Sequence, residues 1–269
     1  MEDLILTTRK RIWYQSFVAP TEQANYLKHL QDQLNQYADK EFQFEVHGLT
    51  PADKNLHPLT EFRCAMQTIR NAVQAEKQGY DAFVIGHFQE PGINEIKACV
   101  DIPVIGLGES TMLHACSLGH KIGLVTINPV FIPWHENQIN YYGLQQRITA
   151  VSAVEAKVQD FEQAFTNSSV YQKLLHAFTE QIRPMIAKGV EVVLLAGGLP
   201  MLLLARQKNF TIDGAIVING IAVCVKGTEM TLKLKELTGG FISRRGIYQK
   251  ANQETVTEFL HLLKEEKFD

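Results

Sequence analysis

The sequence has few of the features that mark membrane, secreted or nucleic-acid-binding proteins. Its longest nearly apolar run, 192–205, is shorter than the roughly 20 residues of a spanning helix, and Gly197, Gly198 and Pro200 interrupt it. Positive charge is not in excess, because 26 Lys and Arg stand against 29 Asp and Glu. This balance argues against binding to nucleic acid or to an anionic membrane. No apolar stretch follows a basic start, so we expect a cytoplasmic protein without a secretory signal.

Two further absences narrow the chemistry. The 4 cysteines, Cys64, Cys99, Cys116 and Cys224, show no CxxC spacing, which favours reduced buried thiols over a zinc site or a disulfide framework. No GxGxxG or Walker spacing follows a predicted strand, and the spacing of His57, Glu61 and His135 matches no metal motif. We therefore expect neither a cofactor nor a metal.

Strand patterns alternate with helical patterns along the 269 residues, 45% of which are hydrophobic. The spacing of three and four residues within 27–37 predicts one amphipathic helix. Phe62, Met66, Ile69 and Val73 predict a second helix, which Gly79 would end. The short apolar run Ala82–Ile85 predicts a strand that is buried on both faces. This alternation is typical of parallel βαβ units.

The second half of the chain repeats the first. A shift of 110 residues places Lys121–Thr126 on Arg11–Ser16, and the same shift places Gly189–Leu195 on Gly79–Ile85. The sequence thus predicts an α/β protein of two pseudo-symmetric Rossmann-like lobes with mainly parallel sheets. We expect lobe 1 over 1–119, lobe 2 over 120–238 and a C-terminal segment, 239–269, that can also pack on lobe 1. Ligands of open α/β sheets bind beyond the carboxyl ends of the strands, so the site is expected in the cleft between the lobes.

Three segments carry a resemblance to a known family: Tyr80–Gly92, Asp101–Ser110 and Gly123–Thr126. They resemble the aspartate/glutamate/hydantoin racemase superfamily, nearest its hydantoin racemase branch. The resemblance implies a pseudo-symmetric two-lobed fold and two cysteines, one after the central strand of each lobe, that act as paired acid and base. His87 stands at the first cysteine position and Gly197 at the second. The segment 15–20 also lacks the Asn-Pro-Asn loop that is usual in this superfamily.

These replacements exclude a cysteine pair, because glycine can neither remove nor return a proton. His87 is the predicted catalytic residue, since histidine titrates near neutrality and a strand end would point it into the cleft. An equally weighted alternative is a histidine that only donates to a backbone carbonyl.

Other polar groups at strand ends and loops are expected to bind substrate. Glu109 and Ser110 follow from the resemblance, although an ordinary capped helix would explain them as well. We expect His87, Glu109, Ser110, Thr126 and the amides of Gly197 and Gly198 to converge on one pocket. The full set of predicted substrate-binding residues is Gln15, Ser16, Phe88, Glu90, Glu109, Ser110, Thr126, Asn128, Gly197 and Gly198.

The resemblance, together with His87 as the one predicted catalytic residue, favours a cofactor-independent isomerase or epimerase. Its expected substrate is a small carboxylate or a cyclic amide such as a hydantoin. A lyase or ring-opening hydrolase on the same fold is one alternative, since a histidine opposite a Gly-Gly loop leaves room for water and for oxyanion donors. A catalytically silent protein that binds a metabolite is another. In each case the expected partner is a small molecule, with neither nucleic acid nor membrane, and the chain is expected to form a homo-oligomer.

Overall fold

The first half of the chain builds one sheet and the helices around it. The computed structural model describes residues 9–52, 56–204 and 206–263. In chain order, the elements of the first half are β1 (Lys10–Gln15), α1 (Ala24–Tyr37), β2 (Phe42–His47), α2 (Pro58–Lys77), β3 (Ala82–Ile85), α3 (Ile93–Cys99), β4 (Val104–Gly106) and α4 (Leu107–Leu118).

The second half builds another sheet, after which the chain returns to the first. Its elements are β5 (Ile122–Thr126), η1 (Pro129–Phe131), α5 (Ile132–Tyr141), β6 (Ile148–Ala153), α6 (Val158–Ala164), α7 (Ser168–Ala187), β7 (Val192–Ala196), α8 (Gly198–Leu204), β8 (Thr211–Ile212) and β9 (Ala215–Val217). The chain then continues through α9 (Gly220–Thr238), η2 (Gly246–Tyr248) and α10 (Gln253–Leu262).

The two sheets share one strand order, and this confirms the predicted fold class and its internal repeat. The first sheet has the order β2-β1-β3-β4 and the second has β6-β5-β7-β9-β8, all parallel except for the antiparallel pair β8 and β9. The pairing of the two central strands in each sheet follows the same shift as the sequence. Gln15 pairs with Ile85 in the first sheet, and Val125 pairs with Leu195 in the second. The placement of the domain boundaries stays a prediction.

Helix α2 forms where the periodicity predicts it, but its buried face is rotated. Pro58 stands in its first turn, the His57 ring accepts from the Leu59 amide at 3.1 Å, and Gly79 adopts a φ of +76° just after the helix. Phe62, predicted to face the core, is 64% exposed. The helix instead buries a strip of smaller side chains, among them Cys64, Thr68 and Ala72. Small residues on the buried face allow the helix to lie close to its sheet.

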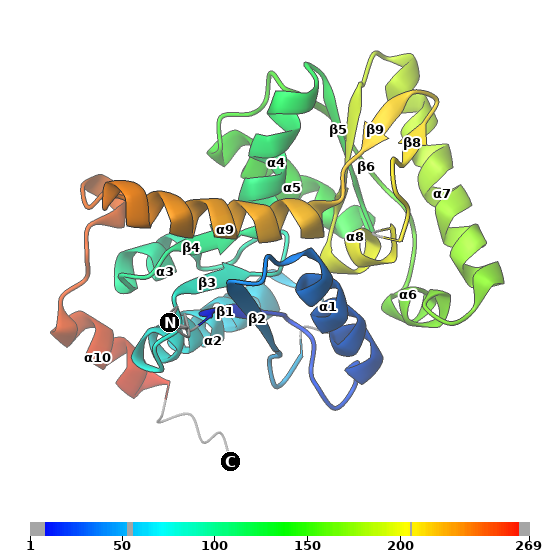
Figure 1. The fold of residues 1–269 in the computed structure, drawn as a ribbon. Coiled ribbons are helices and arrows are strands. Elements are labelled where there is room, and N and C mark those ends of the chain that lie inside the picture. The colour runs from blue at the N-terminus through cyan, green and yellow to red at the C-terminus, as the bar shows by residue number, and fades with distance from the viewer. Residues whose placement is uncertain (1–8, 53–55, 205, 264–269) are drawn as a thin grey trace, which may run out of the picture.

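One apolar core runs through both halves. The larger buried cluster joins side chains of both sheets, such as Ile12 of β1 and Leu124 of β5. Helix α9 packs against α1 and α4 and lies across the boundary between the sheets (Figure 1). The chain then turns back, and Val256 of α10 joins the separate core of the first sheet (Figure 1). No helix in the described part of the chain is long and apolar enough to cross a membrane.

Candidate active site

A small cavity lies at the carboxyl ends of the central strands, where the two sheets face each other. Segments that directly follow β1, β3, β5 and β7 form its walls, and its volume is about 100 Å³. Four of the predicted site residues line it, namely Ser16, His87, Gly197 and Gly198. The position agrees with the rule that open parallel sheets bind ligands beyond their carboxyl edges. We therefore take this cavity as the candidate active site.

The His87 side chain is held in the cavity by two contacts. Its Nε2 lies 3.0 Å from Oε1 of Glu61, in the first turn of α2, and its ring stacks on Phe17 at a centroid distance of 4.5 Å. The side chains of His87 and Glu61 are 19% and 11% exposed. A carboxylate at this distance orients the imidazole and stabilises its protonated form. With Nε2–H donated to Glu61, Nδ1 carries the lone pair that can accept a proton.

Another part of the cavity wall is formed by the two glycines that follow β7. Gly197 has a φ of +143°, which L side chains rarely adopt, so a cysteine at this position would strain the backbone. At Gly198, a β-carbon would lie only 2.6 Å from the hydroxyl oxygen of Tyr26. Tyr26 comes from α1 and is 3% exposed, and the Ser16 side chain lies beside its hydroxyl. The Gly-Gly segment thus leaves room for a tyrosine hydroxyl on this wall.

Three of the predicted substrate-binding residues do not line the cavity. Their side chains are buried and hold the strand-end loops in place. Gln15 is fully buried: its amide nitrogen donates to the carbonyl of His47 at 3.0 Å and its oxygen accepts from Trp13 and Asn71. Phe88 is fully buried in the core. Glu90 points away from the cavity and accepts from the Glu109 amide and the Tyr142 hydroxyl, both at 2.7 Å. Their side chains therefore stabilise the fold and do not line the cavity.

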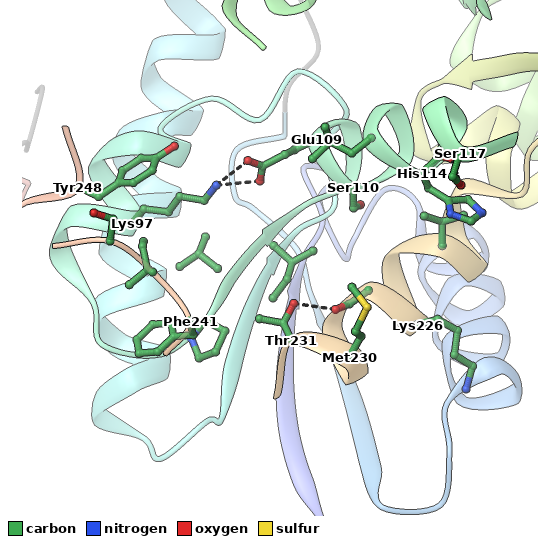
Figure 2. Close-up of a pocket in the computed structure, with 18 of the residues that line it drawn as sticks. Lys97, Glu109, Ser110, His114, Ser117, Lys226, Met230, Thr231, Phe241 and Tyr248 are labelled. Atoms are coloured by element: carbon green, nitrogen blue, oxygen red, sulfur yellow. Dashed lines mark hydrogen bonds and ion pairs between the residues drawn. The ribbon is translucent and has the colours of Figure 1, made fainter. Parts of the chain in front are cut away.

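Glu109 and Ser110 also lie elsewhere, which corrects the expected convergence of all the site residues. They line a separate groove of about 980 Å³ between α4, α9 and the segment 241–248 (Figure 2). There Glu109 accepts from Lys97 Nζ at 2.7 and 2.9 Å, and the Ser110 hydroxyl donates to the Gly106 carbonyl at 2.6 Å. The reason is topological: α4 follows β4 at the edge of the first sheet, and this face of α4 looks toward α9.

Thr126 is the last residue of β5 and Asn128 follows the strand, but neither is among the residues that line the cavity. The Thr126 hydroxyl is fully buried and lies 3.2 Å from Nε2 of His135, while the Asn128 side chain caps η1 by accepting from the Val130 amide. Burial lowers the pKa of His135 to about 4, and a charge on the neighbouring His87 would act in the same direction. His135 is therefore a neutral hydrogen-bonding group beneath the cavity.

Metal-binding geometry is absent from the residues that the structure describes: no three His, Cys, Asp or Glu side chains among them gather in a way that could hold an ion. The four free cysteines lie away from the cavity wall, and Cys64 and Cys224 are fully buried.

Comparison with known proteins now places the chain. Residues 18–228 match the family described as Asp/Glu/Hydantoin racemase. The chain belongs to this racemase family. Curated relatives include a hydantoin racemase of Pseudomonas sp. (strain NS671), 32% identical over 35% of this chain, and one of Rhizobium meliloti, 29% identical over 59%. These alignments span 38% and 63% of the length of the two relatives, less than two thirds in each case.

Solved structures show the same fold at low sequence identity. An allantoin racemase from Pseudomonas fluorescens superimposes with a TM-score of 0.72 at 22% identity, over 90% of this chain and 97% of its own. An allantoin racemase from Klebsiella pneumoniae gives 0.70 at 21% identity, over 90% and 94%. A glutamate racemase from Thermus thermophilus gives 0.60 at 15% identity, over 96% and 94%. These likenesses confirm the fold of the racemase family for this chain.

Within this racemase-family fold, the sequence-based reasoning missed three residues that shape the cavity: Phe17, Tyr26 and Glu61. Glu61 is separated from His87 by 26 positions, and its side chain reaches the His87 ring only because α2 starts beside β3. Tyr26 fits the apolar stripe of α1 and reads as a core residue. In the sequence, Glu61 is a carboxylate in the first helical turn after Pro58. A carboxylate at this position also stabilises the N-terminus of a helix, so the local sequence does not distinguish this role from a role at the site.

Proposed function

We propose that this racemase-family chain catalyses proton transfer at an acidic carbon of a small cyclic amide, such as a hydantoin, or of a small carboxylate. His87 acts as the single base and Glu61 holds its ring. The observation that carries the proposal is the 3.0 Å contact between the Glu61 carboxylate and the imidazole of His87, which lines the strand-end cavity. Family membership and the hydantoin racemase relatives support this substrate class.

The proposed step needs only groups of this chain. The neutral His87 imidazole accepts the proton from carbon, and the C–H electron pair moves into the ring to form a planar enolate. Glu61 stabilises the imidazolium that results. Return of the proton from the imidazolium to carbon restores the imidazole, and the centre inverts when the planar enolate has turned over in the cavity so that His87 protonates its other face. Positioned acid–base groups contribute about 10²–10⁴ in rate.

Cavity size limits the substrate. A volume of about 100 Å³ is far below the roughly 300–1,000 Å³ of sites that take drug-sized ligands. A five-membered ring with a methyl substituent suits such a space better than a ring that carries a benzyl group. We therefore expect 5-methylhydantoin to be preferred to 5-benzylhydantoin.

Deuterium exchange tests the proposal. The chain is incubated with 5-methylhydantoin in D₂O, and loss of the ring C–H signal is followed by proton NMR. We expect wild-type protein to exchange the proton and His87→Ala to lose at least 10²-fold of the rate. His176→Ala, an exposed histidine on α7, is the matched control and should keep the wild-type rate. Equal rates for wild type and His87→Ala would overturn the role of His87, a product heavier by one water would indicate a hydrolase, and binding without exchange would indicate a silent metabolite-binding protein.

A further inference from the structure

Part of the cavity wall carries a pair of buried hydroxyl groups. Tyr26 and Ser16 come from α1 and from the residue after β1, both line the cavity, and they are 3% and 2% exposed. The Ser16 side chain lies beside the Tyr26 hydroxyl. Burying a phenol and an alcohol at a cavity wall costs free energy that packing alone would not require, since phenylalanine and alanine would fill the same space.

Gly198 fixes where the Tyr26 hydroxyl lies. A β-carbon at position 198 would meet that oxygen at 2.6 Å and the carbonyl oxygen of Gly86 at 3.5 Å. Gly86 directly precedes His87, so the tyrosine hydroxyl and the start of the histidine loop flank the same point. Any side chain larger than hydrogen at position 198 would displace the hydroxyl. The glycine therefore keeps the Tyr26 hydroxyl at the cavity, within reach of a small ligand held by His87.

We propose that the Tyr26 hydroxyl, positioned by Ser16, binds a carbonyl oxygen of the ligand and stabilises the enolate that forms when His87 removes the proton. This inference rests on the proposed function. The bond that breaks is C–H; its proton goes to His87, and its electron pair forms the C=C bond while the carbonyl electrons move to oxygen. Tyr26 keeps its own proton and its hydrogen bond to that oxygen becomes charge-assisted, hence stronger.

The environment of Tyr26 suits a donor that stays neutral. Burial raises the pKa of Tyr26 above its ordinary value, and the neighbouring Ser16 hydroxyl only partly offsets this. A phenol in this state donates a hydrogen bond at every physiological pH. Its fixed position also means that no solvent has to reorganise when charge develops on the ligand oxygen.

Tyr26→Phe removes the donor and leaves the ring. Tyr37→Phe is the matched control, because Tyr37 lies on the same helix, outside the cavity, and its hydroxyl accepts a hydrogen bond from the Asn219 side-chain amide at 2.8 Å. In the exchange of 5-methylhydantoin we expect Tyr26→Phe to be slower by about 10²–10³, the usual loss of one oxyanion donor, with an unchanged shape of the pH–rate profile. Tyr37→Phe should retain the wild-type rate, and Ser16→Ala, which only frees the tyrosine hydroxyl, should lose about tenfold. A Tyr26→Phe rate equal to wild type, or an equal loss in Tyr37→Phe, would overturn the inference, and a lost alkaline limb would make Tyr26 an acid–base group instead.

A binding measurement separates failure of this inference from failure of the proposed function. The affinity for hydantoin itself is measured by titration calorimetry for wild type, Tyr26→Phe and His87→Ala. If wild type binds hydantoin but exchanges no proton, the proposed function is wrong, and the enolate role falls with it. A five- to tenfold weaker affinity in Tyr26→Phe would then preserve only the carbonyl contact. If affinity is unchanged in Tyr26→Phe, that contact is wrong as well.

Discussion

Two tyrosines, the buried Tyr14 and the half-buried Tyr142, place their hydroxyls in opposite situations. The Tyr14 hydroxyl is buried, and no hydrogen-bond partner for it lies among the described residues. Tyr142 donates to Oε2 of Glu90 at 2.7 Å. A buried hydroxyl without a partner costs its desolvation, whereas removing a donor from a buried carboxylate leaves that acceptor less satisfied. The same chemical change should therefore have opposite effects at the two sites.

We expect Tyr14→Phe to leave the free energy of unfolding unchanged or to raise it by up to about 1 kcal/mol. Tyr142→Phe should lower it by about 1–3 kcal/mol. Urea denaturation of both variants and wild type at pH 7 measures the difference. A marked loss of stability in Tyr14→Phe would show that its hydroxyl does have a partner.

The sequence could locate His87 because a strand end is a local pattern, and a short apolar strand followed by a polar loop is visible in one segment. It could not locate Glu61 or Tyr26, since Tyr26 reaches the cavity and Glu61 reaches His87 from helices that packing alone brings there. Glu109 and Ser110 show the reverse error. Their helix was predicted correctly, but which face of α4 looks toward the cavity depends on the position of β4 at the sheet edge.

The connection from β4 to α4 is shaped by close contact with the loop after β3. A β-carbon at Gly108 would lie 2.3 Å from the Phe88 carbonyl oxygen and 2.6 Å from Nε2 of Gln138. Gln138 itself donates to that carbonyl, also at 2.6 Å. Gly108 has no positive φ, so its glycine is required by space and not by backbone conformation. The helix start can approach the loop only because this side chain is absent.

Gly108→Ala should therefore destabilise the fold by about 3 kcal/mol, despite the better helix propensity of alanine, because backbone and a buried amide must both shift. Gly240→Ala is the matched control, since a β-carbon there meets no atom within 4 Å, and it should change stability by less than about 0.5 kcal/mol. Thermal unfolding of the two variants gives the comparison. Similar melting temperatures would contradict the close packing of this turn.

Strand order and helix positions were predictable to the extent that they repeat. The shift that aligns the two halves recurs in the pairing of Gln15 with Ile85 and of Val125 with Leu195, so one sheet indicates the other. The helix start at Asn219 also follows from local chemistry, because its side chain accepts from the Ala222 amide. The rotated face of α2 did not follow, since Phe62 is exposed and small residues pack inward.

At the scale of the whole molecule, two buried titratable groups near the junction of the two halves have pKa values that are shifted in opposite directions. Burial raises the pKa of Glu90 from 4.5 to about 7 and lowers the pKa of His135 from 6.5 to about 4. Between pH 4.5 and 7 the folded state holds more protons at Glu90 than the unfolded chain, so the contribution of Glu90 to stability falls as pH rises. Between pH 4 and 6.5 the folded state holds fewer protons at His135, so the contribution of His135 rises with pH. The two contributions oppose each other over nearly the same interval.

Removing either side chain should leave only the pH dependence of stability that the other side chain contributes. We expect the stability of Glu90→Gln, relative to wild type, to rise by about 3 kcal/mol between pH 4.5 and 7, because a contribution that falls with pH is gone. His135→Gln, relative to wild type, should fall by about the same amount between pH 4 and 6.5. Urea denaturation of the three proteins at half-unit steps of pH measures these differences, and titration of all other groups cancels in the comparison. If the free energy of unfolding of both variants changes with pH as it does in wild type, neither side chain changes its protonation on unfolding. Differences of opposite slope would show that Glu90 and His135 compensate each other in the wild-type protein.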